Sequence, residues 1–342
     1  MKILLVGIDF FSYSVSLQHA FERLGHTVKT CEIKQSWGIA GKVYRELFSI
    51  YQKKVKHSNP ICWGPKLLQE IRSKEIVLIA NDFQPDLLVC FPGYGLTKSA
   101  ISKMGDFHKT IWVYDSIQRL PDLIPILSSY DTIFTFEGSD IQKYSELGYN
   151  ANFLPLCVDD HVYYPVDSKK DIDILFIGNL SEARVRELLD IRDAFPDVKM
   201  YVFGRYSITI EKDPELKERL NKHRDIFTKR LVSSEEANTL YSRSKICINI
   251  HHGQSKYGAN MRLFEICAAG GFQIVDSNPY IVENFSDCMA VTKTIEDMKQ
   301  AIRYYLENEN ERMIIAQKGY ERIRQSESFV NRAQEIILKS TQ

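Results

Sequence analysis

The sequence predicts an α/β protein built from two Rossmann-like domains, each with a parallel sheet covered by helices. Apolar runs of about four to eight residues recur along the chain, each followed by a longer amphipathic stretch, as in consecutive β-α-β units. The length of 342 residues suits two domains, because one domain takes roughly 100 to 200 residues. A polar stretch at residues 167–171 separates two series of such runs.

The first series predicts the sheet of the N-terminal domain. Helices are predicted at residues 14–24 and 140–147. Gly25 and Gly148 directly follow them, and left-handed C-caps are expected at these glycines. The predicted strands lie at residues 2–8, 26–31, 87–91, 110–114, 132–136 and 152–154.

The second series predicts a similar sheet in the C-terminal domain, with helices from about residue 295 closing the chain. We expect domains at residues 1–163 and 164–318, and a last helix at residues 319–342 that packs back on the N-terminal domain. Ligands of parallel sheets bind outside the carboxyl ends of the strands, so two facing domains would form one interdomain cleft. The predicted strands lie at residues 172–177, 199–203, 246–250, 272–275 and 289–291, and the predicted helices at residues 181–194, 234–243 and 261–269.

The composition excludes several classes of protein. Lysine and arginine total 44, as do aspartate and glutamate, so no overall charge attracts a polyanion, and nucleic-acid binding is not expected. The seven cysteines form no CxxC motif, and the N-terminal MKILLVGIDFF suits a first strand better than a signal peptide. No stretch approaches the roughly 18 apolar residues of a membrane span. We therefore expect a cytoplasmic protein, or one that is at most peripheral on the inner face of the membrane.

Two common ligand motifs are missing from the sequence. The first strand leads into GIDFFSYS rather than the Gly-rich turn of a dinucleotide site, and no P-loop is present, which disfavours redox and NTPase activity. Asp171 and Asp173 have the spacing of a metal-binding carboxylate pair. They follow two lysines at a strand entrance, however, and we interpret them as solvated residues.

The most informative segment is residues 246–276, which predicts a strand, a Gly-containing loop, a helix beginning near Asn260, a Gly-Gly stop and another strand. A helix N-terminus that opens on a ligand site offers unpaired N–H groups and a positive dipole end to a phosphate. Lys256 precedes this helix, Arg262 lies in its first turn, and Glu265 follows on the same face, within reach of a ribose. An ordinary surface ion pair between Arg262 and Glu265 is the alternative interpretation.

Three runs in the chain between residues 130 and 290 resemble a known family in order and spacing. They are NMRLFEICAAGGFQIVDS preceded by INIHH, DILFIGNLSEARVRELLDI, and DTIFTFEGSDIQKYSELGYNANFLPLCVDDHVYYP. These runs are similar to the CgeB-type, or spore-maturation-like, glycosyltransferases, a branch of GT-B enzymes near the retaining glycosyltransferase family four. The first 125 residues match only in their general Rossmann-like pattern.

The resemblance implies transfer of a sugar from a nucleotide-diphosphate donor, with a UDP-sugar expected, held by the C-terminal domain. Such enzymes stabilise the leaving diphosphate with Lys and Arg side chains and a helix N-terminus, so neither a metal nor a cofactor is expected. In related enzymes two glutamates eight positions apart bracket the donor. Glu265 matches the second, which holds the ribose, but Tyr257 replaces the first, and the stereochemical outcome stays open. Backbone groups around Gly258, Ala259 and Asn260 are candidates for the lost sugar contact.

Further donor-site candidates follow two strands of the C-terminal domain. Gly178 and Asn179 should let the backbone approach the leaving phosphate, with Arg184 reaching in from the next helix. Gly204 and Arg205 end another strand, where they would flank the nucleobase. Simple turn chemistry is the alternative for these positions.

Two aspartates are the candidates for a catalytic base on the acceptor side. Asp115 and Asp9 each follow a predicted strand, where a carboxylate can take a proton from an acceptor hydroxyl. Asp115 is the first candidate and Asp9 the second. Capping of a loop or a helix is the alternative role for both.

One local charge feature lies in the N-terminal domain. Residues 39–57 read IAGKVYRELFSIYQKKVKH, which predicts an amphipathic helix with five Lys or Arg residues and a single Glu46. Such a helix would suit an anionic lipid surface or a charged acceptor. Packing of its apolar face on the core is the simpler alternative.

The leading hypothesis is thus a glycosyltransferase whose partners are a nucleotide-sugar and an acceptor glycan, lipid-linked glycan or protein. A GT-B nucleotide-sugar epimerase is a second hypothesis, against which the family-like run at residues 260–276 argues. A non-catalytic two-domain sugar-binding or nucleotide-binding protein is the third. Sugar-binding proteins of that kind are usually exported, so the expected lack of a signal peptide disfavours it.

Overall fold

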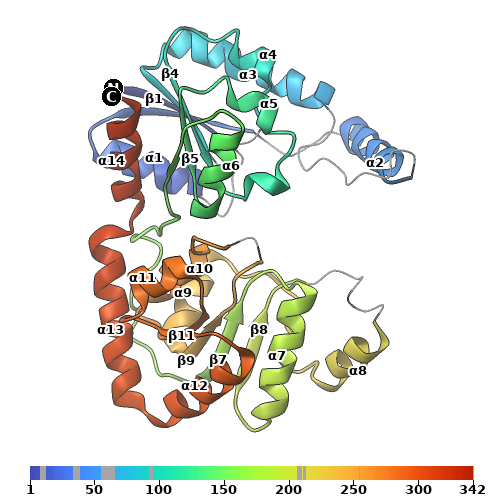
Figure 1. Cartoon of the computed structure of the whole chain (residues 1–342), viewed down its shortest axis with the longest axis vertical. Helices are drawn as coiled ribbons and strands as arrows, with labels where there is room; N and C mark the ends of the chain where they lie inside the picture. The colour runs from blue at the N-terminus through green and yellow to red at the C-terminus, as the bar shows by residue number, and fades with distance from the viewer. Residues whose placement is uncertain are drawn as a thin grey trace. The chain divides into compact units, whose positions relative to one another are not determined.

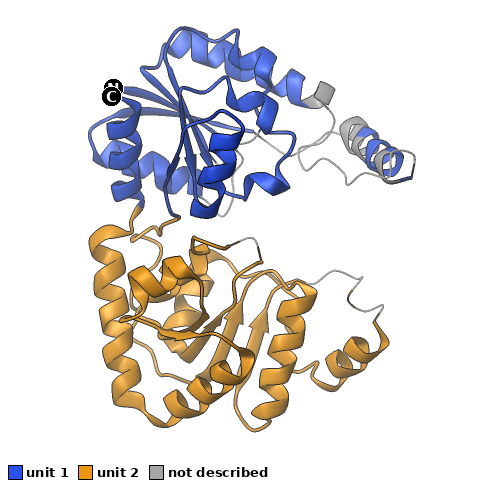
Figure 2. Cartoon of the chain, in the orientation of Figure 1, with its two compact units in different colours: residues 1–155, 329–342 blue, residues 156–328 orange. Residues whose placement is uncertain are grey.

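A computed structural model describes residues 1–7, 13–33, 39–54, 66–91, 95–205, 210, 213–253 and 255–341. The chain forms two compact units, coloured separately in Figure 2. Unit 1 contains Met1–Pro155 and Phe329–Gln342, and unit 2 contains Leu156–Ser328. The chain therefore passes between the units eight residues earlier than the predicted boundary at residue 163 and returns later than the predicted residue 319.

Unit 1 is built on a six-stranded parallel sheet with the strand order β2-β1-β3-β4-β5-β6 (Figure 1). The strands are β1 (Lys2–Gly7), β2 (Thr27–Glu32), β3 (Leu87–Cys90), β4 (His108–Val113), β5 (Thr132–Thr135) and β6 (Ala151–Phe153). The helices are α1 (Tyr13–Arg23), α2 (Ile39–Lys54), α3 (Lys66–Phe83), α4 (Lys98–Ile101), α5 (Ile124–Leu127), α6 (Ile141–Glu146) and α14 (Phe329–Ser340), with 3₁₀ turns η1 (Ile117–Arg119) and η2 (Gly138–Asp140).

The C-terminal helix α14 completes unit 1 rather than unit 2. It packs beside α1 and β4, and the hydroxyls of Thr110 and Ser340 are hydrogen-bonded at 2.7 Å. Arg332 Nε donates to the Pro155 carbonyl at 2.8 Å. This hydrogen bond links the segment in which the chain leaves unit 1 to the helix with which it returns. Ala333 and Ile336 are fully buried, so the apolar face of α14 is part of the core of unit 1.

Unit 2 is built on a five-stranded parallel sheet with the order β11-β10-β9-β7-β8 (Figure 1). The strands are β7 (Ile172–Ile177), β8 (Met200–Phe203), β9 (Ser244–Asn249), β10 (Gln273–Asp276) and β11 (Ala290–Thr292). The helices are α7 (Glu182–Ala194), α8 (Pro214–Lys222), α9 (Ser234–Arg243), α10 (Met261–Ala268), α11 (Pro279–Phe285), α12 (Ile295–Glu307) and α13 (Glu309–Ser326).

Central strands of both sheets are buried along almost their whole length, which explains their continuous apolar sequences. Each predicted strand is present, with ends within two residues of the prediction. Gly25 and Gly148 both have φ of +83°, as expected for left-handed helix C-caps. Helices α3, α4, α5, α8 and α11 were not predicted from the sequence. Across the described residues, no helix has the length and apolarity needed to span a bilayer.

Candidate functional site

The predicted donor residues of unit 2 follow neighbouring strands at one edge of its sheet. The chain runs from β7 to β8 on one side and then crosses to β9 on the other, so the strand order reverses between β7 and β9. In open α/β sheets this reversal opens a crevice at the carboxyl ends of the two strands, where ligands bind. Gly178 directly follows β7, and His251 lies two residues beyond β9.

Two glycines at this edge let the ends of β7 and β8 approach each other closely. The N–H of Gly178 donates to the Phe203 carbonyl at 3.0 Å. A Cβ atom on Gly204 would lie only 2.0 Å from the Gly178 carbonyl oxygen. Arg205 next to it is exposed, and its carbonyl accepts from Leu180 N–H at 3.3 Å. Gly204 is therefore required by backbone packing, whatever ligand the edge binds.

Arg184 lies in the first turn of α7, where Ser181 caps the helix. Its Nη1 donates to the Asn179 carbonyl at 2.8 Å, which fixes the loop after β7. Its Nε is buried and has no hydrogen-bond partner within the described part of the chain. Burial lowers the pKa of Arg184, and the carboxylates of Asp276 and Glu187 oppose that shift. The Arg184 guanidinium thus retains an unused donor near the end of β7.

His251 lies at the same edge and was not among the residues predicted from the sequence. Asp276, at the end of β10, accepts from the His251 backbone N–H at 2.8 Å and is 2.7 Å from His251 Nδ1. The imidazole is 4% exposed, and its Nε2 has no hydrogen-bond partner among the described residues. The only signal in the sequence was a pair of histidines directly after an apolar strand, in the run INIHH.

The start of α10 is tied to the same edge by asparagine side chains. Asn260 caps the helix, with Oδ1 accepting from the Leu263 N–H at 3.1 Å. Its Nδ2 donates to Asn249 Oδ1 at the end of β9 at 2.8 Å. The Gly258 carbonyl accepts from Asn278 at 2.8 Å. Gly258 and Ala259 are buried and Lys256 is exposed, so the predicted helix N-terminus is present and rigidly held.

Glu265 forms an ion pair with Arg262, but the pair is not on the surface. The Glu265 side chain is 1% exposed and that of Arg262 17%, so the interpretation as an ordinary surface pair is wrong. Burial and the nearby Glu265 raise the pKa of Tyr163, and burial likewise raises that of Tyr241. Glu265 therefore shares a buried polar cluster with one cation and two phenols.

Tyr257 replaces the glutamate expected from the family resemblance, and it contacts another carboxylate. Its hydroxyl donates to Glu283 Oε2 of α11 at 2.7 Å, and its ring packs against Tyr280 with centroids 5.7 Å apart. Although Tyr257 replaces the glutamate, a carboxylate still lies close to this position, and it belongs to Glu283 of α11.

On the acceptor side, Asp115 follows β4 in unit 1 and pairs with Arg119 at 2.8 Å. Its side chain is 28% exposed, so it is accessible to a substrate. Asp140, rather than Asp115, accepts from the Ile117 N–H at the start of η1, at 2.8 Å. Asp9 lies outside the described residues.

Asp171 and Asp173 lie at the amino end of β7, away from the carboxyl edge. Arg243 Nε and Nη2 donate to the Asp171 carboxylate at 2.9 and 2.7 Å, and they hold the pKa of Asp171 at about 2. Asp173 pairs with Lys245 at 2.7 Å. These carboxylates therefore form ion pairs at a strand entrance. Across the described ranges, no group of three or more His, Cys, Asp or Glu side chains could hold a metal ion.

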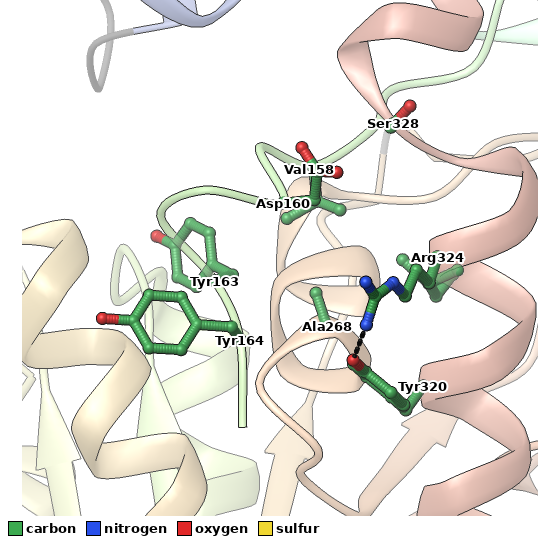
Figure 3. Close-up of a pocket in the computed structure, with 9 residues that line it drawn as sticks. Val158, Asp160, Tyr163, Tyr164, Ala268, Tyr320, Arg324 and Ser328 are labelled. Carbon is green, nitrogen blue, oxygen red and sulfur yellow. Dashed lines mark hydrogen bonds between the residues drawn. The ribbon is translucent and has the colours of Figure 1, made fainter. Parts of the chain in front are cut away.

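A separate pocket of about 140 Å³ lies in unit 2 between the segment that carries Tyr163 and Tyr164 and helix α13 (Figure 3). Arg324 donates to the Tyr320 hydroxyl at 2.5 Å in its wall. Pockets that bury an organic ligand usually measure roughly 300 to 1,000 Å³, so this one is too small for a nucleotide-sugar. None of the predicted donor residues is among the residues that line it.

We predict that Gly204→Ala destabilises unit 2 by about 1 to 3 kcal/mol, because the new methyl group overlaps a backbone oxygen. Denaturant unfolding of the variant, monitored by circular dichroism, measures this loss. Gly253→Ala is the matched control: its Cβ would meet no atom within 4 Å, so a change within about 0.5 kcal/mol is expected. Equal stability of both variants would contradict the close approach of β7 and β8.

Comparison with known proteins gives both a family match and a fold match. Residues 184–337 match a family model described as glycosyl transferase-like. No curated protein sequence matches the chain. The family match covers most of unit 2, including β9 and α10, and begins within α7, after β7.

Several solved structures match over the whole chain. Sucrose-phosphate synthase from Thermosynechococcus elongatus is 14% identical, with a TM-score of 0.72 over 100% of this chain and 98% of that one. A UDP-forming α,α-trehalose-phosphate synthase from Burkholderia vietnamiensis is 9% identical, with a TM-score of 0.66 over 100% of both chains. Anabaena HepE, in complex with UDP and glucose, is 11% identical, with a TM-score of 0.66 over 100% of this chain and 99% of that one. The chain therefore has the GT-B fold that the sequence predicted, and residues 184–337 are similar to glycosyl transferase-like proteins.

Proposed function

We propose that the protein transfers a sugar from a nucleotide-diphosphate sugar, preferably a UDP-sugar, to an acceptor. The observation that carries this proposal is the edge of the unit 2 sheet where the strand order reverses between β7 and β9, and where Arg184 Nε and His251 Nε2 are buried without a partner among the described residues. Buried polar nitrogens without partners are costly unless a ligand uses them. UDP is proposed because the structures of HepE contain UDP or UDP-glucose, and an E. coli trehalose-6-phosphate protein was solved with UDP-2-fluoro glucose.

In the proposed complex the diphosphate contacts the N–H groups at the start of α10, together with the cations Lys256, Arg262 and Arg184. Three cations can stabilise the charge that develops on a leaving diphosphate, so we propose that transfer requires neither a metal nor a cofactor. Gly178 and Asn179 approach the phosphates, and Gly204 and Arg205 flank the base. The backbone of Gly258, Ala259 and Asn260 contacts the sugar, and Glu265 binds the ribose hydroxyls.

For the acceptor, a glycan, lipid-linked glycan or protein, we propose Asp115 as the general base, with Asp9 as the second candidate. The ion pair with Arg119 orients the Asp115 carboxylate while leaving it accessible. We further propose that the protein acts in the cytoplasm and belongs to the CgeB-type branch that its sequence resembles.

A thermal-shift panel of nucleotide diphosphates followed by a donor hydrolysis assay tests this function. UDP at about 100 times its dissociation constant should stabilise the protein by about 2.7 kcal/mol. Slow release of UDP from UDP-sugars, unchanged by EDTA, is expected. An isomerised donor would instead support the epimerase hypothesis, and binding without hydrolysis a non-catalytic binding protein. Loss of UDP release in EDTA would contradict metal independence.

Glu265→Gln should remove the preference of the wild-type protein for UDP over 2′-deoxy-UDP. A charged hydrogen bond contributes roughly 1.5 to 3 kcal/mol, so UDP affinity should fall at least about tenfold while 2′-deoxy-UDP affinity changes little. Calorimetric titration measures both, and Glu296→Gln on the exposed face of α12 is the control. A parallel loss of affinity for both nucleotides would show that Glu265 only supports the fold.

Two substitutions separate the roles of the nitrogens of His251. Asparagine places an amide where Nδ1 stands and so retains the contact with Asp276, whereas glutamine extends an amide toward the position of Nε2. If Nε2 carries a proton and donates it to a diphosphate oxygen, His251→Asn should weaken UDP binding about tenfold and leave uridine binding unchanged, and His251→Gln should weaken UDP binding less. Titrations with UDP and uridine check this order, and the reverse order would assign His251 a purely structural role.

Asp115→Asn should leave UDP affinity unchanged and lower turnover about 10²- to 10⁴-fold, because a general base acts only on the acceptor. Steady-state rates with the identified donor and acceptor, together with UDP titration, measure the two effects. Asp122→Asn, which changes an exposed carboxylate of the same unit, is the control. Unchanged turnover would transfer the proposed role to Asp9.

A further inference from the structure

We propose that α2 is a membrane-docking helix, which inserts its apolar face into the surface of a bilayer containing anionic lipids. The proposal rests on the exposure and the charge of this one helix, and it is independent of the proposed transferase activity. It also corrects the simpler alternative drawn from the sequence, in which the apolar face packs on the core.

The apolar side chains of α2 lie on one face of the helix. Val43, Leu47 and Ile50 are spaced by four and three residues, and Tyr44 and Tyr51 are adjacent to them on the same side. Such a face normally packs against a protein core, as that of α1 does, where Leu17 and Phe21 are fully buried. The sequence pattern alone therefore cannot distinguish the two environments.

The structure leaves this face of α2 in solvent. The five side chains are between 42% exposed, for Tyr44, and 61% exposed, for Leu47. No described side chain of α2 is buried. Figure 1 shows the helix standing apart from the sheet and from the helices that cover it. A contiguous apolar face of this kind on a protein surface marks an interaction site.

The charge of the segment identifies the partner. Residues 39–57 contain five Lys or Arg residues and one Glu, a local net charge of +4 in a chain whose total is zero. Lys54 is exposed at the end of the helix. A helix that combines an apolar face with an excess of basic residues binds in the plane of an anionic lipid surface. Tyr44 and Tyr51 reinforce this match, since tyrosine is enriched at membrane–water interfaces.

A second copy of the chain fits the apolar face of α2 less well than an anionic bilayer does. Two α2 helices packed face to face would bring two segments of like charge together, which opposes association. An anionic bilayer instead neutralises the charge while it buries the apolar side chains. We therefore infer that the lipid surface is the partner, and a dimer becomes an outcome of the test.

The test is co-sedimentation of the full chain with vesicles of phosphatidylcholine, with and without about 30 mol% phosphatidylglycerol. Wild-type protein should bind the anionic vesicles, bind the zwitterionic ones at least about tenfold less, and be released by about 0.5 M NaCl. The double substitution Leu47→Glu with Ile50→Glu should reduce binding at least about tenfold without lowering the melting temperature, because both side chains are exposed.

Met313→Glu with Ile314→Glu is the matched control, because these neighbours on α13 are 61% and 58% exposed. This control should bind vesicles like the wild type. Absence of wild-type binding, or equal binding by both double variants, would overturn the proposal. Sedimentation velocity tests the alternative partner, a second copy of the chain. If the wild type binds no lipid but forms a concentration-dependent dimer, and only Leu47→Glu with Ile50→Glu disrupts that dimer, the apolar face of α2 is a dimer interface and the proposal is overturned.

Discussion

Burial of both sheets on their two faces is the constraint on which the rest of the structure depends. Central strands covered on both sides must be apolar along their length, so polar chemistry is confined to the strand ends. In a parallel sheet the carboxyl ends meet at one edge. This is how Gly178, His251 and Asp276, which lie within a span of nearly one hundred residues of sequence, come to the same edge of the sheet.

Rigidity at this edge comes from polar contacts between loops rather than from regular structure. Asp276 holds His251 through two hydrogen bonds, and Asn260 ties the start of α10 to β9. A loop fixed in this way loses little further entropy when a ligand binds. Pre-organised donors are also what a leaving diphosphate requires, because they do not have to reorient as charge develops.

Glu265 illustrates how structural and functional demands compete at one residue. Its carboxylate and the Arg262 guanidinium are both largely removed from water, and breaking such a pair leaves an uncompensated charge. If the proposed ribose contact forms, Glu265 gains a further partner without losing Arg262. Substitution by alanine would therefore mix two effects, which is why a comparison between ribose and deoxyribose is more informative than affinity alone.

The order of apolar and polar residues determined the strands, their sequence along the chain and the helix caps, because these depend on contacts local in sequence. It also indicated the start of α10 and the glycines at the strand ends. Tertiary structure decided what depends on distant residues: the burial of the Arg262–Glu265 pair, the pairing of His251 with Asp276 and the residues at which the chain leaves and re-enters unit 1. The same amphipathic spacing is buried in α1 and exposed in α2, since periodicity identifies an apolar face but not what covers it.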